Sequence, residues 1–528
     1  MRTWTIRGDR MTFGMMRRLC TAIALICCCA AQPAAARWLR ADTNNFIIYS
    51  EGDEKSLRQF AENLQLFDAT LRHRFNVPGG FEPNRLTIYL LPRSADVNRL
   101  SGGRLGPGTA GFYSVTTDGS FAVSNRENDG NTGRGTSASQ QILFHEYSHH
   151  FMKRYMPVAF PAWFIEGFAE YLSTVDFEKD GRPAVGRPVY SRAYGLLALP
   201  KIPAERLLSE RPTAMKNLAQ QDAYYGRAWL LTHMLYSEPS RSGQLLTYMQ
   251  AINRGDDPTK AASAAFGDLA TLDKDLNSYL NRRLSYTLLH KPMVVEGAIS
   301  ITPLSAAEDA LLPLRMARLS ASDDQERLTK LTADLRQLAA LHPGNAEVWF
   351  ELAASEWDKD DEQRDLAATR AAVDKALALK ADHVRANVLL GRLLVKEMDA
   401  KGDYSEAAWR AVRKPIALAN RTNPDDPLPL FEFFQSYVDQ GQRPPAIALQ
   451  GLAQAFSLEP ENVTIRINHA FALANAGKFD AAADLAKTIA FDPHDRGNGQ
   501  NLLDQIEAMR DRGKDGTVTD ADVGAADD

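Results

Sequence analysis

The sequence predicts an α+β front domain, made of an N-terminal sheet and a helical half, followed by an all-α solenoid. Up to about residue 300, short runs rich in β-branched and aromatic residues alternate with helical patterns. From residue 325 onward the pattern changes to helices rich in alanine and leucine. Breaks between these helices recur at intervals of roughly 33–43 residues, the range of helical-hairpin repeats.

The first 36 residues differ from the rest of the chain. Five arginines precede the apolar run "LCTAIALICCCAA", and Ala34 and Ala36 form an A-x-A pattern before a cleavage point. This order is typical of a secretory signal peptide, and the alternative is an uncleaved anchor. All four cysteines of the chain lie in this segment: Cys20, Cys27, Cys28 and Cys29. We therefore expect residues 1–36 to be removed and the mature chain, without cysteine, to be exported, with the periplasm as the best fit.

The charge of the chain limits its classes of partner. The formal net charge is −5, and residues 1–36 hold five arginines and one aspartate, a net +4, so their removal leaves −9. A mildly acidic protein offers no electrostatic basis for binding nucleic acid. Past the leader, no apolar run is long enough to span a membrane. We expect neither a nucleic-acid partner nor a membrane span after cleavage of the leader.

The elements of the front domain, residues 37–300, follow from periodicity and turn signals. Apolar residues at helical spacing predict a helix over 54–75. A Gly/Asn/Ser-rich loop then precedes a helix that Ser137 or Ser139 caps, and Pro161 begins the next of several helices, which extend to about residue 283. Strands are expected over the runs 46–50 and 85–91, a hairpin over 108–125, and a further strand-like run over 293–301.

The C-terminal part divides into a linker, an array and a tail. Residues 301–324 are expected to be the linker, and residues 325–510 the array of helical hairpins. The segments "GDYSEAAWRAV" and "GKFDAAADLAKTI" pair a glycine turn with an aromatic residue and an alanine-rich helix, a pattern that resembles tetratricopeptide repeats. The alternative is a helical domain without repeats. Residues 511–528 are polar and acidic, and we expect them to be disordered.

The motif "HEYSH" predicts a metal site. Residues four apart share one face of a helix, so His145 and His149 project together and their imidazoles can bind one ion. Zinc favours imidazole ligands, with three protein ligands and a water in a catalytic site. Glu146 is turned away from the ligands and can take the proton of a water that the metal activates. His150 lies about 100° around the helix from His149 and cannot face the same ion.

A third ligand is expected from "PAWFIEGFAEY". Glu166 and Glu170 are again four residues apart, on a helix that begins near Pro161. One of these carboxylates can complete the site. The other can accept a hydrogen bond from a ligand histidine and so fix the orientation of its ring.

An HExxH motif followed by a helix of the form W-x-x-E-G-x-A-E-Y resembles the gluzincin, or peptidase-MA-like, metallopeptidases. The resemblance covers about residues 38–300, and its sharpest motifs lie within 145–171. It implies a gluzincin-like fold with one Zn²⁺ per chain, in which Glu166 is the third ligand and Glu170 orients a histidine. The helix "YGRAWLLTHML" is similar to one in the aminopeptidase branch, which implies that Tyr225 binds the developing oxyanion. Tyr224 is the neighbouring alternative.

The resemblance also sets expectations about the substrate. The stretch Gly-x-Met-Glu-Asn, with which the aminopeptidases grip a free amine, is not found here, which puts aminopeptidase activity in doubt. In gluzincins an edge strand before the zinc helix pairs with the substrate backbone, and the hairpin over 108–125 is the candidate for it. The expected substrate is therefore a protein or peptide.

Three functions remain open at the level of sequence. The leading one is an exported zinc metallopeptidase whose repeats recruit a substrate or a protein partner. The second is a cell-envelope repeat scaffold or binding protein, in which the peptidase-like domain is inactive. The third is a zinc hydrolase that acts on a non-peptide amide such as a cell-wall bond, since the same ligands would serve.

Overall fold

The computed structural model describes six stretches of the chain: residues 38–103, 110–116, 118–127, 136–321, 324–493 and 497–514. The expected signal peptide, residues 1–36, lies outside the described residues. Of the expected disordered tail, residues 511–528, the first four belong instead to helix α22 (Asn498–Lys514), and the part from residue 515 onward also lies outside the described residues.

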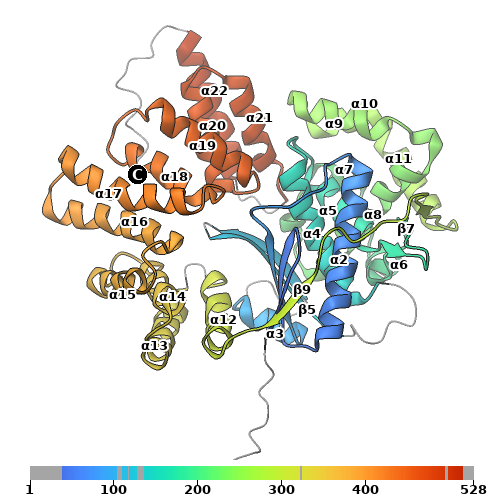
Figure 1. The fold of residues 1–528 in the computed structure, drawn as a ribbon. Helices are drawn as coiled ribbons and strands as arrows, with labels where there is room; N and C mark the ends of the chain where they lie inside the picture. Colours follow the sequence, from blue (N-terminus) through green and yellow to red (C-terminus); the bar gives the residue numbers. More distant parts are fainter. Residues whose placement is uncertain are drawn as a thin grey trace, which may run out of the picture.

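A six-stranded sheet lies in the middle of the molecule, between the helical half of the front domain and the C-terminal helices (Figure 1). Its order is β4-β5-β3-β2-β1-β9, with β2, β3 and β5 parallel and the other neighbours antiparallel. The bounds are β1 (Leu39–Asp42), β2 (Phe46–Ser50), β3 (Leu86–Leu91), β4 (Gly111–Thr116), β5 (Gly119–Asn125) and β9 (Ser300–Pro303). The expected strands and the hairpin are confirmed. Of the run 293–301, only its last two residues belong to a strand.

The two faces of the sheet bury different partners, because side chains alternate along a strand. Ile88 and Leu90 of β3 pack with α2 (Glu54–Phe75) and α4 (Ala138–Tyr155). Tyr89 and Leu91, on the opposite face, pack with α3 (Ser94–Leu100) and α12 (Ala306–Leu319). The helix predicted over 54–75 is thus observed with those bounds, and α4 lies directly on the sheet.

The rest of the front domain is mainly helical and packs around α5 and α8. A small second sheet of β6 (Asp176–Phe177), β7 (Pro183–Val185) and β8 (Thr287–Leu288) lies beside it. The helices are α5 (Ala162–Ser173), α6 (Ala193–Leu197), α7 (Ala204–Ser209), α8 (Leu218–Ser237), α9 (Gln244–Arg254), α10 (Pro258–Phe266) and α11 (Leu269–Leu280), with short 3₁₀ helices η1 (Tyr190–Arg192), η2 (Pro212–Ala214) and η3 (Pro239–Arg241).

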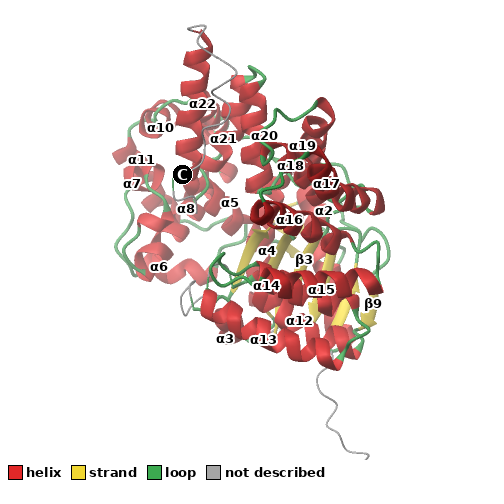
Figure 2. Ribbon diagram, turned by 90° about the vertical axis from the view of Figure 1, so that its left-hand side faces the viewer, coloured by secondary structure: helices red, strands yellow, loops and turns green. Residues whose placement is uncertain are grey.

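The expectation of a linker over 301–324 is wrong for most of that segment. Strand β9 completes the sheet beside β1, and α12 follows it. Leu312 and Met316 of α12 pack on the sheet, whereas Leu311 packs against the first helices of the array. Figure 1 shows α12 between the strands and α13 and α14, and in Figure 2 the helices α14 and α15 lie in front of the strands. The segment therefore packs between the front domain and the array, and burial of apolar side chains on both of its sides stabilises it.

The C-terminal helices form consecutive antiparallel hairpins, as the spacing of the breaks predicts. The breaks near residues 342, 380, 423, 459 and 492 all coincide with helix ends. Asn345 and Asn462 cap the helices that follow two of these breaks with their side chains. The helices are α13 (Gln325–Leu341), α14 (Ala346–Trp357), α15 (Leu366–Leu379), α16 (Val384–Lys401), α17 (Glu406–Thr422), α18 (Pro427–Val438), α19 (Ala446–Leu458), α20 (Val463–Asn475), α21 (Phe479–Ala490) and α22 (Asn498–Lys514).

The turn of the β4–β5 hairpin contacts both α12 and the array. Asp118 in the hairpin turn forms an ion pair of 2.6 Å with Arg318 and lies 3.8 Å from Arg385. Burial opposes the charge of Asp118, but the two guanidinium groups prevail and hold its pKa well below the usual range. A cavity of about 380 Å³ lies between this turn and helices α12, α14, α16 and α18. The surface that α14, α16 and α18 turn toward this cavity is thus partly covered by the front domain itself.

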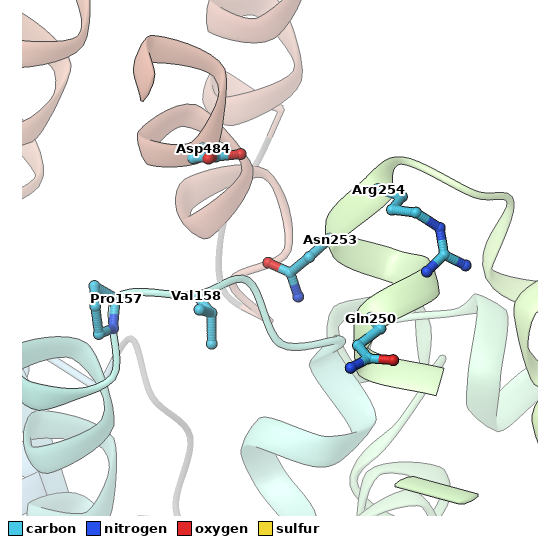
Figure 3. Close-up of a pocket in the computed structure, with 6 residues that line it drawn as sticks. All are labelled: Pro157, Val158, Gln250, Asn253, Arg254 and Asp484. Atoms are coloured by element: carbon cyan, nitrogen blue, oxygen red, sulfur yellow. The ribbon is translucent and has the colours of Figure 1, made fainter. Parts of the chain in front are cut away.

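A second contact joins the array to helix α4. Glu461, at the start of α20, accepts hydrogen bonds from Arg154 at 3.0 Å and from Ser120 at 3.1 Å. Further along, Lys487 of α21 donates to the carbonyl oxygen of Asn253 at 2.8 Å. A cavity of about 410 Å³ lies at this place. Figure 3 shows the residues that line it, from α21 (Asp484), from α9 and from the loop before α5. The array therefore contacts both halves of the front domain.

Glu459 gives this interface a dependence on pH. Its carboxyl group is buried, and burial together with the charge of Glu461 raises its pKa from 4.5 to about 8. Asp426 acts in the same direction, whereas Arg385 and a hydrogen bond from Asn462 oppose the shift. A raised pKa means that the folded protein binds this proton more tightly than the unfolded chain. The contribution of Glu459 to stability therefore falls as pH rises from about 4.5 to about 8.

We expect Glu459→Gln to remove part of the pH dependence of unfolding. Between pH 8 and pH 6 the wild-type protein should gain about 2 kcal/mol from protonation of Glu459, and the variant should lack this gain. Urea unfolding of both proteins at the two pH values measures the difference, and groups that do not interact with Glu459 titrate equally in both proteins and cancel. Glu326→Gln, at an exposed position of α13, is the matched control. Equal pH dependence in wild type and Glu459→Gln would contradict the assignment.

Among the described residues, none of the helices has the length and apolar character needed to cross a membrane.

Candidate metal centre

Helix α4 places the HEYSH motif in the middle of the front domain. Ser137 caps its N-terminus by accepting a hydrogen bond from the backbone of Gln140, which decides between the two serines considered above. The helix ends at Tyr155, two residues before Pro157. His145 and His149 lie on one face, as their spacing requires, with ring centroids 4.7 Å apart.

Helix α5 brings Glu166 to the same point. It begins directly after Pro161 and is buried along its whole length. The Nε2 atoms of His145 and His149 are 3.1 Å apart, and Oε2 of Glu166 lies 3.5 Å from the first and 3.6 Å from the second. Among the described residues, these three form the one group of possible metal ligands. The structure therefore brings together all three residues that the sequence and the resemblance select.

The dimensions of this triangle fit a zinc ion. A tetrahedral zinc site with ligands about 2.0–2.2 Å from the ion holds the ligand atoms about 3.3–3.6 Å apart. The three separations, 3.1, 3.5 and 3.6 Å, are close to this range. Two imidazoles and one carboxylate are also a donor set that suits zinc, whereas calcium and magnesium prefer sites made of oxygen atoms. The side chain of His145 is 16% exposed and that of Glu166 is 1% exposed, so the site opens on the His145 side.

The electrostatics of the site favour a cation. Burial lowers the pKa of the His145 imidazole, but a hydrogen bond with Glu166 and the charges of Glu170 and Glu146 prevail and raise it to about 9. This negative potential acts on any positive charge at the same place. The same carboxylates would therefore attract a divalent cation to this place.

Glu170 lies one turn after Glu166 and reaches the other nitrogen of the ring. Its Oε1 atom is 3.4 Å from Nδ1 of His145, and its side chain is almost fully buried. This is the place from which a carboxylate orients a ligand histidine. Glu146, adjacent to His145, is only partly buried and contributes to the potential at the site.

The structure separates the two candidate tyrosines of α8. Tyr224 is fully buried and donates its hydroxyl to the carbonyl oxygen of Glu210 at 2.9 Å, away from the triangle. The charge of Glu166 reaches both tyrosines, and those of Glu170 and Glu146 also act on Tyr225. Burial raises its pKa most, and the charges of Glu166, Glu170 and Glu146 raise it further. Its hydroxyl therefore stays protonated at neutral pH and remains a hydrogen-bond donor.

His150 and Arg227 have structural roles. His150 is buried on another face of α4, where its Nδ1 lies 3.1 Å from the hydroxyl of Tyr113 on β4. Arg227 pairs with Asp273 at 2.7 Å. Strand β4 lies at the edge of the described sheet and packs against α4, since a Cβ atom at Gly111 would come within 2.5 Å of Ile142. The edge strand and the HEYSH helix are thus direct neighbours.

Two residues of the site were missed by the sequence analysis. Arg192 of η1 binds Glu170, and Asp222 of α8 binds Arg192 on its other side. No motif marks either residue. Arg192 follows Glu170 by 22 residues, a separation that matches no helix or strand period. Only the packing of α5, η1 and α8 shows that the two side chains pair.

Gly167 allows α5 and α8 to approach closely. A Cβ atom at this position would come within 2.3 Å of Thr232 Oγ1 and 2.5 Å of the Ala228 carbonyl oxygen. Such distances are far below normal contact, so a side chain would force the two helices apart. The glycine between Glu166 and Phe168 therefore sets the distance between the helix of the acidic residues and the helix of Tyr225.

We expect Gly167→Ala to destabilise the protein by about 1–3 kcal/mol in urea unfolding, because overpacking shifts the backbone of α5 or α8. Gly451→Ala is the matched control. It also lies inside a helix, but its Cβ would meet the nearest atom at 3.6 Å, an ordinary contact. The control should be neutral or slightly stabilising. The same loss of stability in both variants would mean that the close approach of α5 and α8 is not the cause.

Comparison with known proteins gives a limited likeness. No protein-family model matches the chain, and no curated protein matches it. Among solved structures, the chain is similar to a thermophilic TPR protein of Thermus thermophilus, at 16% identity and a TM-score of 0.30, over 39% of this chain and 98% of that one. It is also similar to the MamA RS-1 ArsTM double mutant, at 14% identity and a TM-score of 0.25, over 39% of this chain and 99% of that one.

The helical repeat region is evident from the hairpins of α13 to α22 themselves. The described part of the chain is mainly helical, with a six-stranded and a three-stranded sheet in its front domain.

Proposed function

We propose that the front domain is a zinc-dependent metallopeptidase of the gluzincin type, and that the helical repeats recruit its substrate or a protein partner. The observation that carries the proposal is the triangle of His145, His149 and Glu166, with sides of 3.1–3.6 Å. Three protein ligands and an open side are the features of a catalytic zinc site. A zinc ion, when bound, supplies a Lewis acid that lowers the pKa of water and polarises a carbonyl group.

The surrounding residues have the chemistry that hydrolysis of an amide requires. Glu146 accepts the proton of the attacking water as the water oxygen bonds to the carbonyl carbon, and then delivers that proton to the leaving nitrogen. The hydroxyl of Tyr225 donates a hydrogen bond to the oxyanion that develops on the carbonyl oxygen. The edge strand β4 offers backbone groups to an extended peptide. These roles are assigned from position and chemistry.

The second candidate function is a repeat scaffold with an inactive front domain, located in the cell envelope. The helical hairpins support it directly, because such arrays bind protein partners through their extended surfaces. The hairpin turn at Asp118 already covers part of the array surface, beside Arg318 and Arg385. A partner of the repeats would therefore use the remaining surface or compete with this turn.

The experiment combines metal content with three classes of substrate. Elemental analysis of the exported, purified chain gives zinc per chain. The same sample is incubated with denatured protein, short peptides and cell-wall fragments, with and without a zinc chelator. One equivalent of zinc and chelator-sensitive cleavage of protein or peptides supports the peptidase. Cleavage of cell-wall fragments alone supports the non-peptide hydrolase, and well under one equivalent after zinc supply, with no cleavage, supports the scaffold.

A further inference from the structure

Arg192 connects three elements next to the candidate metal centre. It ends η1, and its guanidinium group lies between Glu170 of α5 and Asp222 of α8. Nε and Nη2 donate to Oε1 of Glu170 at 3.0 and 2.7 Å, and Nη1 donates to Oδ1 of Asp222 at 2.9 Å. Two carboxylates thus hold the guanidinium group, Glu170 through two of its nitrogens and Asp222 through the third.

The Glu170 oxygen that Arg192 binds is the one that faces the histidine. Oε1 of Glu170 lies 3.4 Å from Nδ1 of His145, while Nε2 of the same ring points into the ligand triangle. A carboxylate buried at this depth needs a compensating charge, and Arg192 provides it. The result is a chain of contacts from Arg192 through Glu170 to His145. Such a chain would hold the rotation of the imidazole and, with the proton on Nδ1, would leave the Nε2 lone pair available for a metal ion in the triangle.

Arg192 also lies beside Tyr225, the residue proposed to bind the oxyanion. Its guanidinium carbon lies 5.0 Å from the centre of the Tyr225 ring. The close approach of α6 to α8 depends on Gly195, where a Cβ atom would come within 2.5 Å of Asp222 Oδ2. The packing of η1 and α6 on α8 therefore places Arg192 against the acid that orients a ligand and against the tyrosine at once.

We propose that Arg192 is a positioning residue of the zinc site, which holds Glu170 against His145 and fixes the ring of Tyr225. The inference rests on the proposed function, since it concerns the same site. Arg192 is not assigned a contact with the substrate, because the structure uses its guanidinium group on Glu170 and Asp222. It acts through these neighbours on the ligand histidine.

The test uses Arg192→Met, Arg192→Lys and the matched control Arg187→Met. Arg187 lies in the same connection and has an analogous environment: Asp176 at 2.9 Å, Glu178 at 3.0 Å and the ring of Tyr286 at 5.0 Å. None of these partners touches the ligand triangle in the described contacts. Zinc affinity is measured by competition with a chromophoric chelator, together with the melting temperature of the metal-free protein and the kcat and KM for peptide cleavage.

Arg192→Met is expected to weaken zinc binding by about 10–100-fold, as loss of an outer partner of a ligand usually does. Arg192→Lys should restore part of this loss, because an ammonium group keeps the charge but not the fork. Arg187→Met should leave zinc affinity unchanged. In Arg192→Met, kcat should fall more than KM rises. The metal-free variant should melt below Arg187→Met, because it leaves the 4% exposed Glu170 without its arginine, whereas the partners of Arg187 are 16% and 39% exposed. Zinc affinity is therefore compared at a temperature at which both variants are folded.

Three results would overturn the inference. Equal zinc affinity in wild type and Arg192→Met would show that Arg192 does not position the ligand. An equal loss in Arg187→Met would show a general effect of removing an arginine from this connection. A rise in KM alone, with zinc affinity unchanged, would make Arg192 a substrate contact. If the wild-type protein binds zinc in these cases, the proposed function survives; if it binds none, both fail.

Discussion

Glu146→Gln is expected to bind one equivalent of zinc per chain and to lose hydrolysis by about 10²–10⁴-fold. The amide has nearly the same size as the carboxylate, and Glu146 is not one of the three ligand residues. The variant therefore keeps the ion and loses the group that accepts the proton of water and returns it to the leaving nitrogen. Elemental analysis and peptide cleavage on the same sample measure the two effects separately.

The control is Glu205→Gln, a substitution of the same kind at an exposed position of α7. It should leave both zinc content and cleavage unchanged. Full activity of Glu146→Gln would remove the general base from the proposed mechanism and, with it, the assignment as a gluzincin-type peptidase. Loss of zinc from Glu146→Gln would instead mean that this residue supports the ligands.

His145→Ala should strip the protein of zinc, with a content far below one equivalent after dialysis. Two protein ligands seldom hold the ion, and His145 supplies one corner of a triangle of three. Glu166→Ala should have the same result, because its carboxylate is the third corner and is almost fully buried. Peptide cleavage should disappear together with the metal in both variants.

His73→Ala, on the exposed side of α2, is the control for removal of a histidine. It should keep one equivalent of zinc. Circular dichroism of all variants distinguishes loss of a ligand from loss of the fold. Full zinc content in His145→Ala and Glu166→Ala, with the fold intact, would place the metal elsewhere or leave the chain as a repeat scaffold.

The array also contacts the elements of the front domain that carry the proposed site. Glu461 of the array binds Arg154 at the C-terminal end of α4, the helix that carries His145 and His149. Asp118, in the turn after the edge strand β4, is held by Arg318 and Arg385. The array therefore supports both the HEYSH helix and the strand proposed to bind substrate, in addition to any partner that it recruits.

Features that depend on near neighbours in the chain were readable from the sequence. The spacing of His145 and His149 places them on one face of a helix because an α-helix repeats every 3.6 residues. The break residues of the array and the serine cap before α4 follow from local backbone preferences in the same way. The position of Glu166 opposite the histidines was implied only by a family resemblance, and the packing of α5 on α4 brings it there.

The segment 301–324 contains a local signal for a helix, which contradicts the prediction of a linker. Ser305 and Glu308 form a capping box that begins α12, and both residues are visible in the sequence. Pro313 argues against a continuous helix, because an interior proline costs a hydrogen bond and introduces a steric clash. Burial of Leu312 and Met316 on the sheet and of Leu311 on the array stabilises the helix in spite of it.

The sequence by itself determined the two histidines with their neighbouring glutamate, most of the strands and helices, and the repeating C-terminal part. Only the tertiary structure bound the Tyr224 hydroxyl to the carbonyl oxygen of Glu210, paired Arg192 with Glu170, and joined Glu461 to Arg154 across 307 residues. Hydrogen bonds and ion pairs act over a few ångströms in space, and the chain separation of the partners leaves no periodic trace. Such contacts exist only after the helices have packed.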